Sequence, residues 1–177
     1  MKPPEIFETE RLRLRPPTMD DAEAIFVGYA QDEQVAKYMT WRPHKSIEET
    51  QDYLLHCLNE WQDGSAFPWV ITRKENGQLI GVVELNIDKF MAAVGYVLAR
   101  AYWGQGYMPE AVKAIVDWGL AQTGIFRIWA LCDVENSASA RVMEKVGMRR
   151  EGILRRRTIH PNVSEEPRDV CCYSIVK

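Results

Sequence analysis

The segment Ala101–Val112, which reads AYWGQGYMPEAV, combines residue types that could hold a phosphate group. It follows an apolar run, Ala93–Leu98, and leads into residues with helical spacing. The free N–H groups and the dipole at the start of a helix attract anions. Gly104 and Gly106 would let the backbone approach a phosphate closely, and Pro109 is tolerated in a first helical turn. We therefore predict an anion-binding loop, with an ordinary strand-to-helix turn as the alternative.

The segments before this loop must build the surface that carries it. In ETERLRLRP, Leu12 and Leu14 alternate with arginines, which predicts a half-exposed strand from Glu8 to Pro16. Thr18 begins a T-x-x-D sequence and Ser46 begins S-x-x-E, and apolar residues at helical spacing follow both. We expect two amphipathic helices there, joined by a linker.

The later segments alternate between strand and helix patterns. Asn76-Gly77 separates two strand-like runs and is a strong hairpin signal. Strands are predicted at 69–72, 78–87, 92–98, 125–131, 148–154 and 170–176, and helices from the glycine loop to about residue 122 and from 136 to 147. The order β-α-α-β-β-β-α-β-α-β-β predicts one mixed α/β domain over residues 1–177.

The composition is that of an ordinary globular chain. The 177 residues are 46% hydrophobic and 27% charged, enough to build one core. No apolar run approaches the roughly 20 residues of a membrane span, and the amino terminus lacks the apolar core of a signal peptide, so we expect a cytoplasmic protein without a membrane partner. The net charge of −3 argues against general nucleic-acid binding. The four cysteines have no metal-ligand spacing, and we expect reduced, mostly buried thiols and no metal.

Three separate segments resemble one family. ETERLRLRP, WGQGYMPEA and CDVENSASARVMEKVGMRREG are similar, in this order, to the ribosomal-protein N-terminal (Rim-type) branch of the GCN5-related N-acetyltransferases (GNAT). The family's loop pattern is Arg/Gln-x-x-Gly-x-Gly/Ala, of which Gly106 is a full match, while Trp103 and Met108 stand at the other positions. The resemblance covers nearly the whole chain. It implies the acyl-CoA N-acyltransferase fold, a mixed, mostly antiparallel central sheet with helices on both faces.

The resemblance also implies where acetyl-CoA would bind. In the family, the strand before the glycine loop separates from its neighbour, and its free backbone groups hold the pantetheine arm and supply an oxyanion donor. Carried over to this sequence, the cosubstrate contacts are Val97, Leu98, Trp103, Gly104, Gln105, Gly106, Tyr107, Met108, Asn136 and Ser139. Asn136 would also cap the following helix.

Acetyl transfer from a thioester to an amine needs a group that protonates or solvates the departing thiolate. Many relatives use a tyrosine in the helix after Asn136, but Met143 stands at that position. The resemblance to the Rim-type branch implies Ser139 instead. A serine is a weak acid, so it would solvate the sulfur or relay a proton through water.

The amine must also lose a proton, and the sequence leaves the base open. Glu84 lies in the strand-like run GVVELNID, where some relatives carry a carboxylate base, and burial could raise its pKa. A paired or solvated strand residue is the alternative. The glutamate of some Rim-type enzymes is replaced near Thr158, while His160 follows in a segment expected to be an exposed loop. Glu84, His160 and water are the three candidates.

The predicted activity is therefore acetyl-CoA-dependent N-acetylation of a primary amine by direct attack in a ternary complex. No Ser-His-Asp or Cys-His arrangement is legible, which fits a reaction without a covalent enzyme intermediate. The leading acceptor is a protein N-terminal α-amino group, and a small amine such as a polyamine, amino acid or aminoglycoside is the alternative. A closed pocket of Tyr38, Trp41 and Trp69 would favour the small molecule. A CoA-binding module without turnover is a further alternative, and a homodimer stays open.

Overall fold

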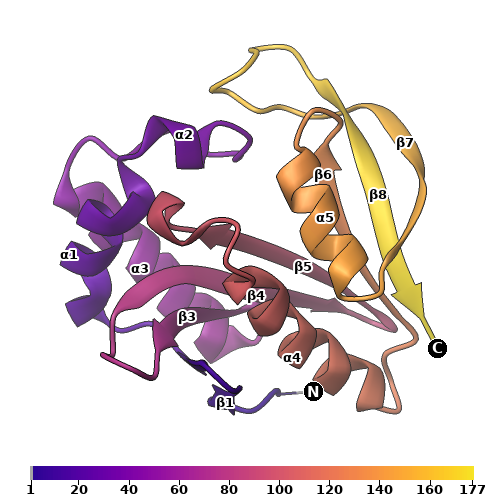
Figure 1. Ribbon diagram of the computed structural model, residues 1–177, viewed down its shortest axis with the longest axis horizontal. Helices are drawn as coiled ribbons and strands as arrows, with labels where there is room; N and C mark the ends of the chain where they lie inside the picture. The colour runs from indigo at the N-terminus through magenta and orange to yellow at the C-terminus, as the bar shows by residue number, and fades with distance from the viewer. Residues whose placement is uncertain (1) are drawn as a thin grey trace.

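The computed structural model describes residues 2–177, which form one sheet with helices on both faces (Figure 1). Within these residues eight strands lie in the order β1-β2-β3-β4-β5-β6-β8-β7, and every neighbouring pair except β5–β6 is antiparallel. The strands are β1 (Phe7–Glu8), β2 (Leu12–Arg15), β3 (Phe67–Arg73), β4 (Leu79–Asp88), β5 (Met91–Leu98), β6 (Arg127–Asp133), β7 (Arg149–Thr158) and β8 (Arg168–Val176). The α-helices are α1 (Ala22–Ile25), α2 (Glu33–Ala36), α3 (Ile47–Asp63), α4 (Tyr107–Ala121) and α5 (Ser137–Lys145). The mixed, mostly antiparallel α/β fold is confirmed.

The strand alternation divides the core between the two faces of the sheet. Val83 of β4 belongs to the larger apolar cluster, which includes Ile115 of α4 and Met143 of α5. Val82, the next residue back, belongs to the second cluster with Leu54 of α3. Because successive side chains of a strand point to opposite faces, α4 and α5 cover one face and α1 and α3 cover the other.

The N-terminal segment differs from the prediction of one strand over residues 8–16. It forms two short antiparallel strands, β1 and β2, with a turn between them. The Thr9 backbone N–H donates to the carbonyl oxygen of Leu12 (3.0 Å), and the Leu12 N–H donates to Thr9 Oγ1 (3.0 Å). The predicted alternation holds in β2, where Leu12 and Leu14 are buried and Arg13 is exposed. The hydrogen bond to the Thr9 side chain closes the turn, and an alternating apolar pattern does not reveal such a bond.

The helices before β3 begin where the caps predict. The Thr18 N–H donates to Asp21 Oδ2 (2.8 Å), and α3 follows Ser46 directly. The first helical segment is not uniform, because α1 continues into a wider π-type turn over 26–30. The linker contains a short helix that the sequence analysis missed, α2, capped by Asp32 Oδ1, which accepts from the Gln34 N–H (2.9 Å). One helical turn is too short to show a periodic pattern.

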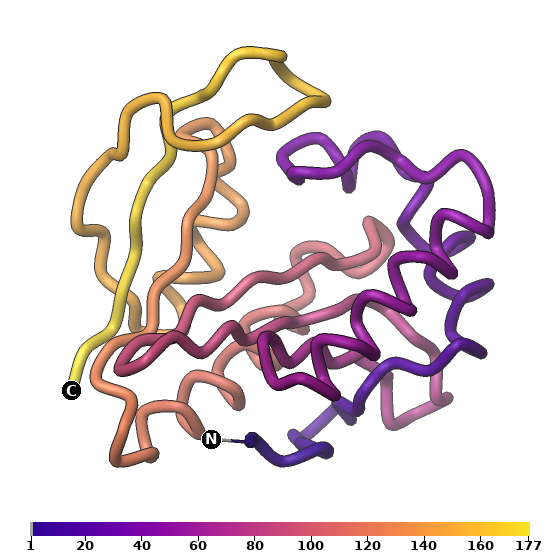
Figure 2. Tube along the Cα trace, turned by 180° about the vertical axis from the view of Figure 1, so that it is seen from behind, coloured from indigo at the N-terminus to yellow at the C-terminus, as the bar shows by residue number. Residues whose placement is uncertain are grey.

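The parallel strands β5 and β6 pair only at their starts. Met91–Ala93 pair with Arg127–Trp129, after which β5 continues along β4 and β6 continues along β8. Within the described chain no strand pairs with the last five residues of β5 on the β6 side. Figure 2 shows the two strands diverging. Backbone groups of β5 are thereby left for another partner.

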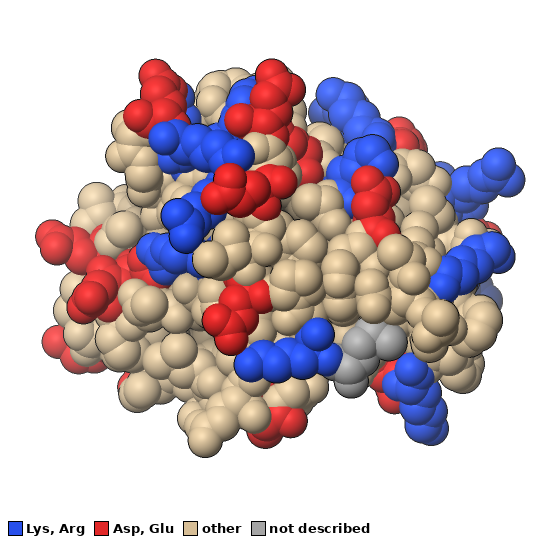
Figure 3. Space-filling view, turned by 90° about the horizontal axis from the view of Figure 1, so that it is seen from below, with Lys and Arg blue, Asp and Glu red and all other residues tan. Residues whose placement is uncertain are grey.

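The remaining global expectations concern thiols, membranes and charge. All four cysteines are free and buried, as predicted. Among residues 2–177 no helix is both long and apolar enough to cross a membrane. On the face shown in Figure 3, acidic and basic side chains are interspersed, which is typical of a solvated surface.

Candidate active site

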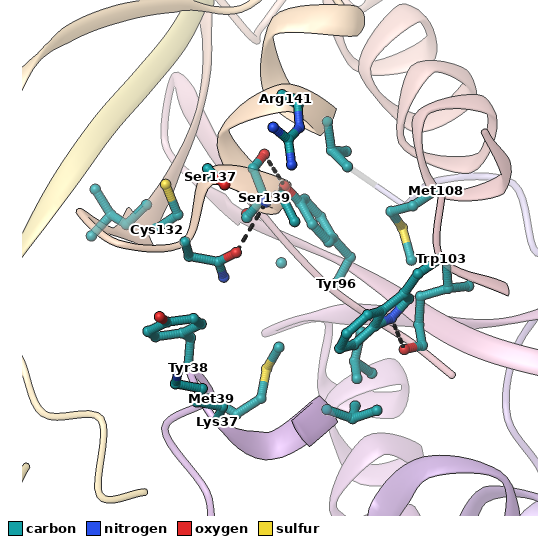
Figure 4. A pocket seen from close by; sticks show the side chains of 18 of the residues that line it. Lys37, Tyr38, Met39, Tyr96, Trp103, Met108, Cys132, Ser137, Ser139 and Arg141 are labelled. Carbon is teal, nitrogen blue, oxygen red and sulfur yellow. Dashed lines mark hydrogen bonds between the residues drawn. The ribbon is translucent and has the colours of Figure 1, made fainter. Parts of the chain in front are cut away.

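A cleft of about 760 Å³ opens where β5 and β6 separate. Its walls come from the second halves of both strands, the glycine loop, the starts of α4 and α5, the residues after α2 and the end of β7. Figure 4 shows Tyr38 and Met39 on one side of this cleft and Ser137, Ser139 and Arg141 of α5 on the other. Segments from both ends of the chain thus meet around one space.

The predicted acetyl-CoA contacts gather in this cleft. All of them line it except Gln105, whose side-chain amide donates to the carbonyl oxygen of Ala101 (2.8 Å). The Trp103 indole N–H donates to the carbonyl oxygen of Leu98 (2.8 Å), so the tryptophan braces the loop against the end of β5. The structure therefore brings the loop, β5 and α5 together, while each individual contact stays a prediction.

The glycine loop has the backbone geometry of an anion cradle. Gly104 (φ 75°) and Gly106 (φ 81°) both lie in the left-handed region that favours glycine. α4 starts directly after Gly106, so its first N–H groups face the loop. A Cβ on Gly106 would lie 3.4 Å from Arg11 Nη2. The residues present therefore fit a pyrophosphate at this helix start.

Arg11 and Glu110 connect the N-terminal turn to this loop. Glu110 Oε2 accepts from Arg11 Nε (2.7 Å), and Oε1 accepts from the Arg11 N–H (2.8 Å) and from Thr9 Oγ1 (2.5 Å). Arg11 Nη1 also donates to the carbonyl oxygen of Gln105 (3.0 Å), and its guanidinium lies 4.3 Å from the centre of the Tyr107 ring. We call these contacts the Arg11–Glu110 latch. The sequence analysis missed it, although two of the segments that carry the family resemblance supply its members.

Ser139 has a partner that the sequence analysis also missed. Asn136 caps α5 as predicted, since its Oδ1 accepts from the Ser139 N–H (3.1 Å). The hydroxyl groups of Tyr96 and Ser139 lie 2.8 Å apart, and Tyr96 Oη also donates to the Ser139 carbonyl oxygen (3.1 Å). Burial raises the pKa of Tyr96, although its hydrogen bond with Ser139 acts in the opposite direction. The phenol is therefore a neutral hydrogen-bond donor at physiological pH.

Met143 occupies a different environment from the cleft. It is fully buried in the larger core cluster, among side chains of α4 and the sheet. The cleft instead receives its phenol from β5, through Tyr96, close to the start of the same helix. A strand tyrosine of this kind could have been found from the side-chain direction of residues 94, 96 and 98, which share one face of β5.

Glu84 lies one strand away from the cleft. It shares the α3 face of β4 with Val82 and accepts from Asn86 Nδ2. Burial, and next the negative charge of Glu84, raises the pKa of Glu60 on α3. In the ladder Glu84 is opposite Gly95, which is exposed and lines the cleft. A Cβ on Gly95 would meet no heavy atom within 4 Å.

His160 is not the exposed loop residue that the sequence suggested. It is 5% exposed and lines the cleft. Its ring packs edge to face with the ring of Tyr38, at a centroid distance of 6.5 Å. Tertiary contacts bury it, because Asn162 Nδ2 donates to the carbonyl oxygens of Ala36 (2.7 Å) and Trp41 (2.8 Å). This tie draws the segment after β7 across to the α2 region.

A glycine loop at a helix start, beside two parallel strands that separate, defines an acyltransferase of the acyl-CoA N-acyltransferase type. The family model for the acetyltransferase (GNAT) domain matches residues 11–149. An uncharacterized N-acetyltransferase of Bacillus subtilis, YoaA, is 33% identical over 175 residues, 97% of each chain. A GNAT acetyltransferase structure from Bacillus anthracis is 29% identical, with a TM-score of 0.83 over 97% of this chain and 98% of that one. A putative ribosomal-protein-serine acetyltransferase structure from Vibrio cholerae is 25% identical, with a TM-score of 0.86 over the full length of both chains.

The chain therefore belongs to the GNAT acetyltransferases, and the resemblance to their Rim-type branch is supported by the Vibrio cholerae structure. It is an acetyltransferase whose cosubstrate is acetyl-CoA. Among residues 2–177 no group of three His, Cys, Asp or Glu side chains could hold a metal ion.

Proposed function

We propose that this acetyltransferase acts on the α-amino group of a protein or peptide N-terminus, by direct attack on the bound thioester. The charge of the cleft is the observation that carries the proposal. Lys37, Arg141 and Lys145 line it, whereas Glu135 is its one acidic lining residue within the described chain and is paired with Arg168 (3.1 Å). A peptide N-terminus brings one cationic group, which loses its charge before attack. A polyamine or aminoglycoside brings several and would be repelled.

The aromatic residues also favour the larger acceptor. A closed pocket of Tyr38, Trp41 and Trp69 would have supported a small amine, but Trp69 is fully buried in the core. Its indole N–H donates to the carbonyl oxygen of Pro4 (3.2 Å), and its ring packs against Phe7 and Trp61. Tyr38 does line the cleft. The three rings therefore do not enclose a pocket.

Two groups of cleft residues have separate roles in the proposed reaction. Bound acetyl-CoA supplies an activated acetyl group as a thioester. The backbone of Val97 and Leu98, which within the described residues no strand pairs on the β6 side, would hold the pantetheine arm and supply an N–H to the carbonyl oxygen as it gains charge. Ser139, with the Tyr96 hydroxyl 2.8 Å away, would donate to the departing sulfur. Ser139 lies in the first turn of α5, where the helix dipole stabilises a thiolate, and the Tyr96 hydroxyl reaches it from β5.

For the proton of the amine, the sequence leaves Glu84, His160 and water as the candidates. Glu84 would act through a water molecule beside Gly95, where a Cβ would meet no heavy atom within 4 Å. The cytoplasmic location and the homodimer remain predictions from sequence.

The experiment that tests the acceptor class is acetyl-CoA-dependent thiol release with a panel of amines. Peptides with free and blocked N-termini, polyamines, amino acids and aminoglycosides should be compared at equal concentration, and the acetylated atom located by mass spectrometry. We expect the highest kcat/KM with free N-terminal peptides and none with their blocked counterparts. A higher kcat/KM for a polyamine would refute the proposal. Acetyl-CoA binding without thiol release for any amine would instead support a CoA-binding module.

A further inference from the structure

The side chain of His160 is buried, and within residues 2–177 no hydrogen bond satisfies it. It is 6% exposed, and in the described chain neither ring nitrogen has a hydrogen-bond partner. A buried polar group without a partner costs free energy, so native structures rarely keep one without a role. His160 also lines the cleft, so this buried imidazole forms part of the wall of the proposed active site.

A fixed carboxylate lies behind the imidazole. Asp133 Oδ2 is 3.7 Å from His160 Nε2, and the Asp133 side chain is completely buried. Arg168 holds it in place with Nε to Oδ2 (2.6 Å) and Nη2 to Oδ1 (3.1 Å), and the Glu135 N–H donates to Oδ1 (2.9 Å). Burial acts to raise the pKa of Asp133, but these hydrogen bonds outweigh it and lower the pKa. Asp133 is therefore ionised and cannot turn away.

Charged side chains from several elements lie around His160. Asp133 of β6 and Glu135 before α5 carry two negative charges, and Arg168 of β8 carries one positive charge. Tyr38, from the segment after α2, contributes an aromatic ring, and Lys37 Nζ lies 5.0 Å from the centre of that ring. Asp133, Glu135 and Arg168 together carry one net negative charge, which a positive charge on the His160 ring would offset. The cluster can thus take up a proton without leaving an uncompensated buried charge.

We propose that His160 is the catalytic base of the acetyl transfer, with Asp133 as its positioning residue; this rests on the proposed N-acetylation. The amine nitrogen forms a bond to the acetyl carbon, the carbon–sulfur bond breaks, and the electron pair of that bond leaves with the sulfur. The proton of the amine passes to a ring nitrogen of His160. The sulfur leaves as a thiolate, which the hydroxyl groups of the Tyr96–Ser139 pair solvate by hydrogen bonding. His160 takes the place of Glu84 because it lines the cleft itself, whereas Glu84 would need a water molecule across Gly95.

The test compares three glutamine variants, His160→Gln, Glu84→Gln and His56→Gln, with the wild type. The rate is measured with the preferred amine of the acceptor panel at saturating acetyl-CoA. The pH is varied from about 5.5 to 9 in steps of about half a unit, a range in which histidine side chains change charge. His56 is the matched control, because it is an exposed histidine on α3 that pairs with Glu60. We expect His160→Gln to lose ~10²-fold or more in kcat at neutral pH, and to lose the decline in rate that the wild type shows at acidic pH. Acetyl-CoA affinity should change less than about threefold, as measured by calorimetry.

A second variant separates catalysis from packing. His160→Ala removes the ring and leaves space, so added imidazole should restore part of the rate if the ring acts as a base. A purely structural role would not respond to imidazole. The proposal is overturned if His160→Gln and His160→Ala, shown to be folded by circular dichroism, keep kcat within a few-fold, or if Glu84→Gln alone removes the acidic decline. If either variant is unfolded, a wild-type rate independent of pH from 5.5 to 7.5 overturns it. Wild-type protein that acetylates no amine would refute the proposed function itself, a separate result.

Discussion

The Arg11–Glu110 latch gives a sharp prediction for Glu110→Gln. An amide can keep its oxygen at the Oε1 position, where Thr9 Oγ1 and the Arg11 N–H donate, but its NH₂ group then faces Arg11 Nε, which is also a donor. The variant therefore loses the charge-assisted bond of 2.7 Å and sets two donors against each other. Such a bond contributes about 1.5–3 kcal/mol when buried. The Arg11 side chain is 41% exposed, so water replaces part of this and we expect about 1–2 kcal/mol of lost unfolding free energy.

The same change should weaken acetyl-CoA binding. Arg11 Nη1 holds the carbonyl oxygen of Gln105 (3.0 Å), and a released guanidinium leaves the loop less organised before the cosubstrate arrives. We expect a loss of affinity of about three- to tenfold, with kcat at saturating acetyl-CoA nearly unchanged. Urea denaturation measures the first effect and calorimetry the second. Asp117→Asn is the matched control, because it removes an exposed carboxylate paired with Lys113 on the same helix and should cost at most about 0.5 kcal/mol.

The pH dependence of the latch follows from the lowered pKa of Glu110. Burial acts to raise this pKa, but the hydrogen bonds from Thr9 and Arg11 outweigh it and lower the pKa below the ordinary value of 4.5. A group with a lowered folded-state pKa stabilises the protein above its unfolded pKa and loses that contribution as the pH falls through the folded pKa. The stability difference between wild type and Glu110→Gln should therefore be full at pH 7 and shrink below about pH 4.5. An equal difference at pH 7 and pH 3, or stability and affinity unchanged at pH 7, would refute the reasoning.

Three further predictions address the cosubstrate and the two sides of the reaction. CoA should raise the melting temperature of the wild type, because it binds the folded state. Gly106→Asp should abolish this shift, and Gly106→Ala should only reduce it. A full shift in folded Gly106→Asp would contradict the loop assignment. Ser139→Ala should lower kcat by roughly 10- to 10³-fold with similar acetyl-CoA affinity. Tyr96→Phe in that background should add little, because the two hydroxyl groups act together. Full kcat with weaker acetyl-CoA binding would show that Ser139 is a helix-cap residue and CoA contact only. Glu84→Gln should lower kcat only a few-fold if His160 is the base. If Glu84 is the base instead, kcat should fall by ~10²-fold at neutral pH. Steady-state kinetics of this variant decide between the two residues.

Features built from neighbouring residues were predictable from the sequence alone. Asn76-Gly77 forms the predicted turn, with Gly77 at a φ of 72°, and Asn136 caps α5 through the N–H of Ser139, three residues ahead. The glycine loop belongs to the same group, because Gly106 adopts its positive φ at the start of α4. Turns, caps and alternation depend on contacts within a few residues, so local residue types carry enough information to predict them. The sequence also determined the family, because three separated segments match it in order.

Only the tertiary structure decided which side chains face each other across the cleft. Tyr96 and Ser139 are 43 residues apart in the chain, and Arg11 and Glu110 are 99 residues apart. His160 looked like an exposed loop residue, yet ties from Asn162 to Ala36 and Trp41 bury it against Asp133. Such pairs depend on where the diverging β5 and β6 and the packing of α2 place distant segments. Burial and long-range hydrogen bonding leave no period or spacing in the sequence, and these contacts therefore appear only once the chain has folded.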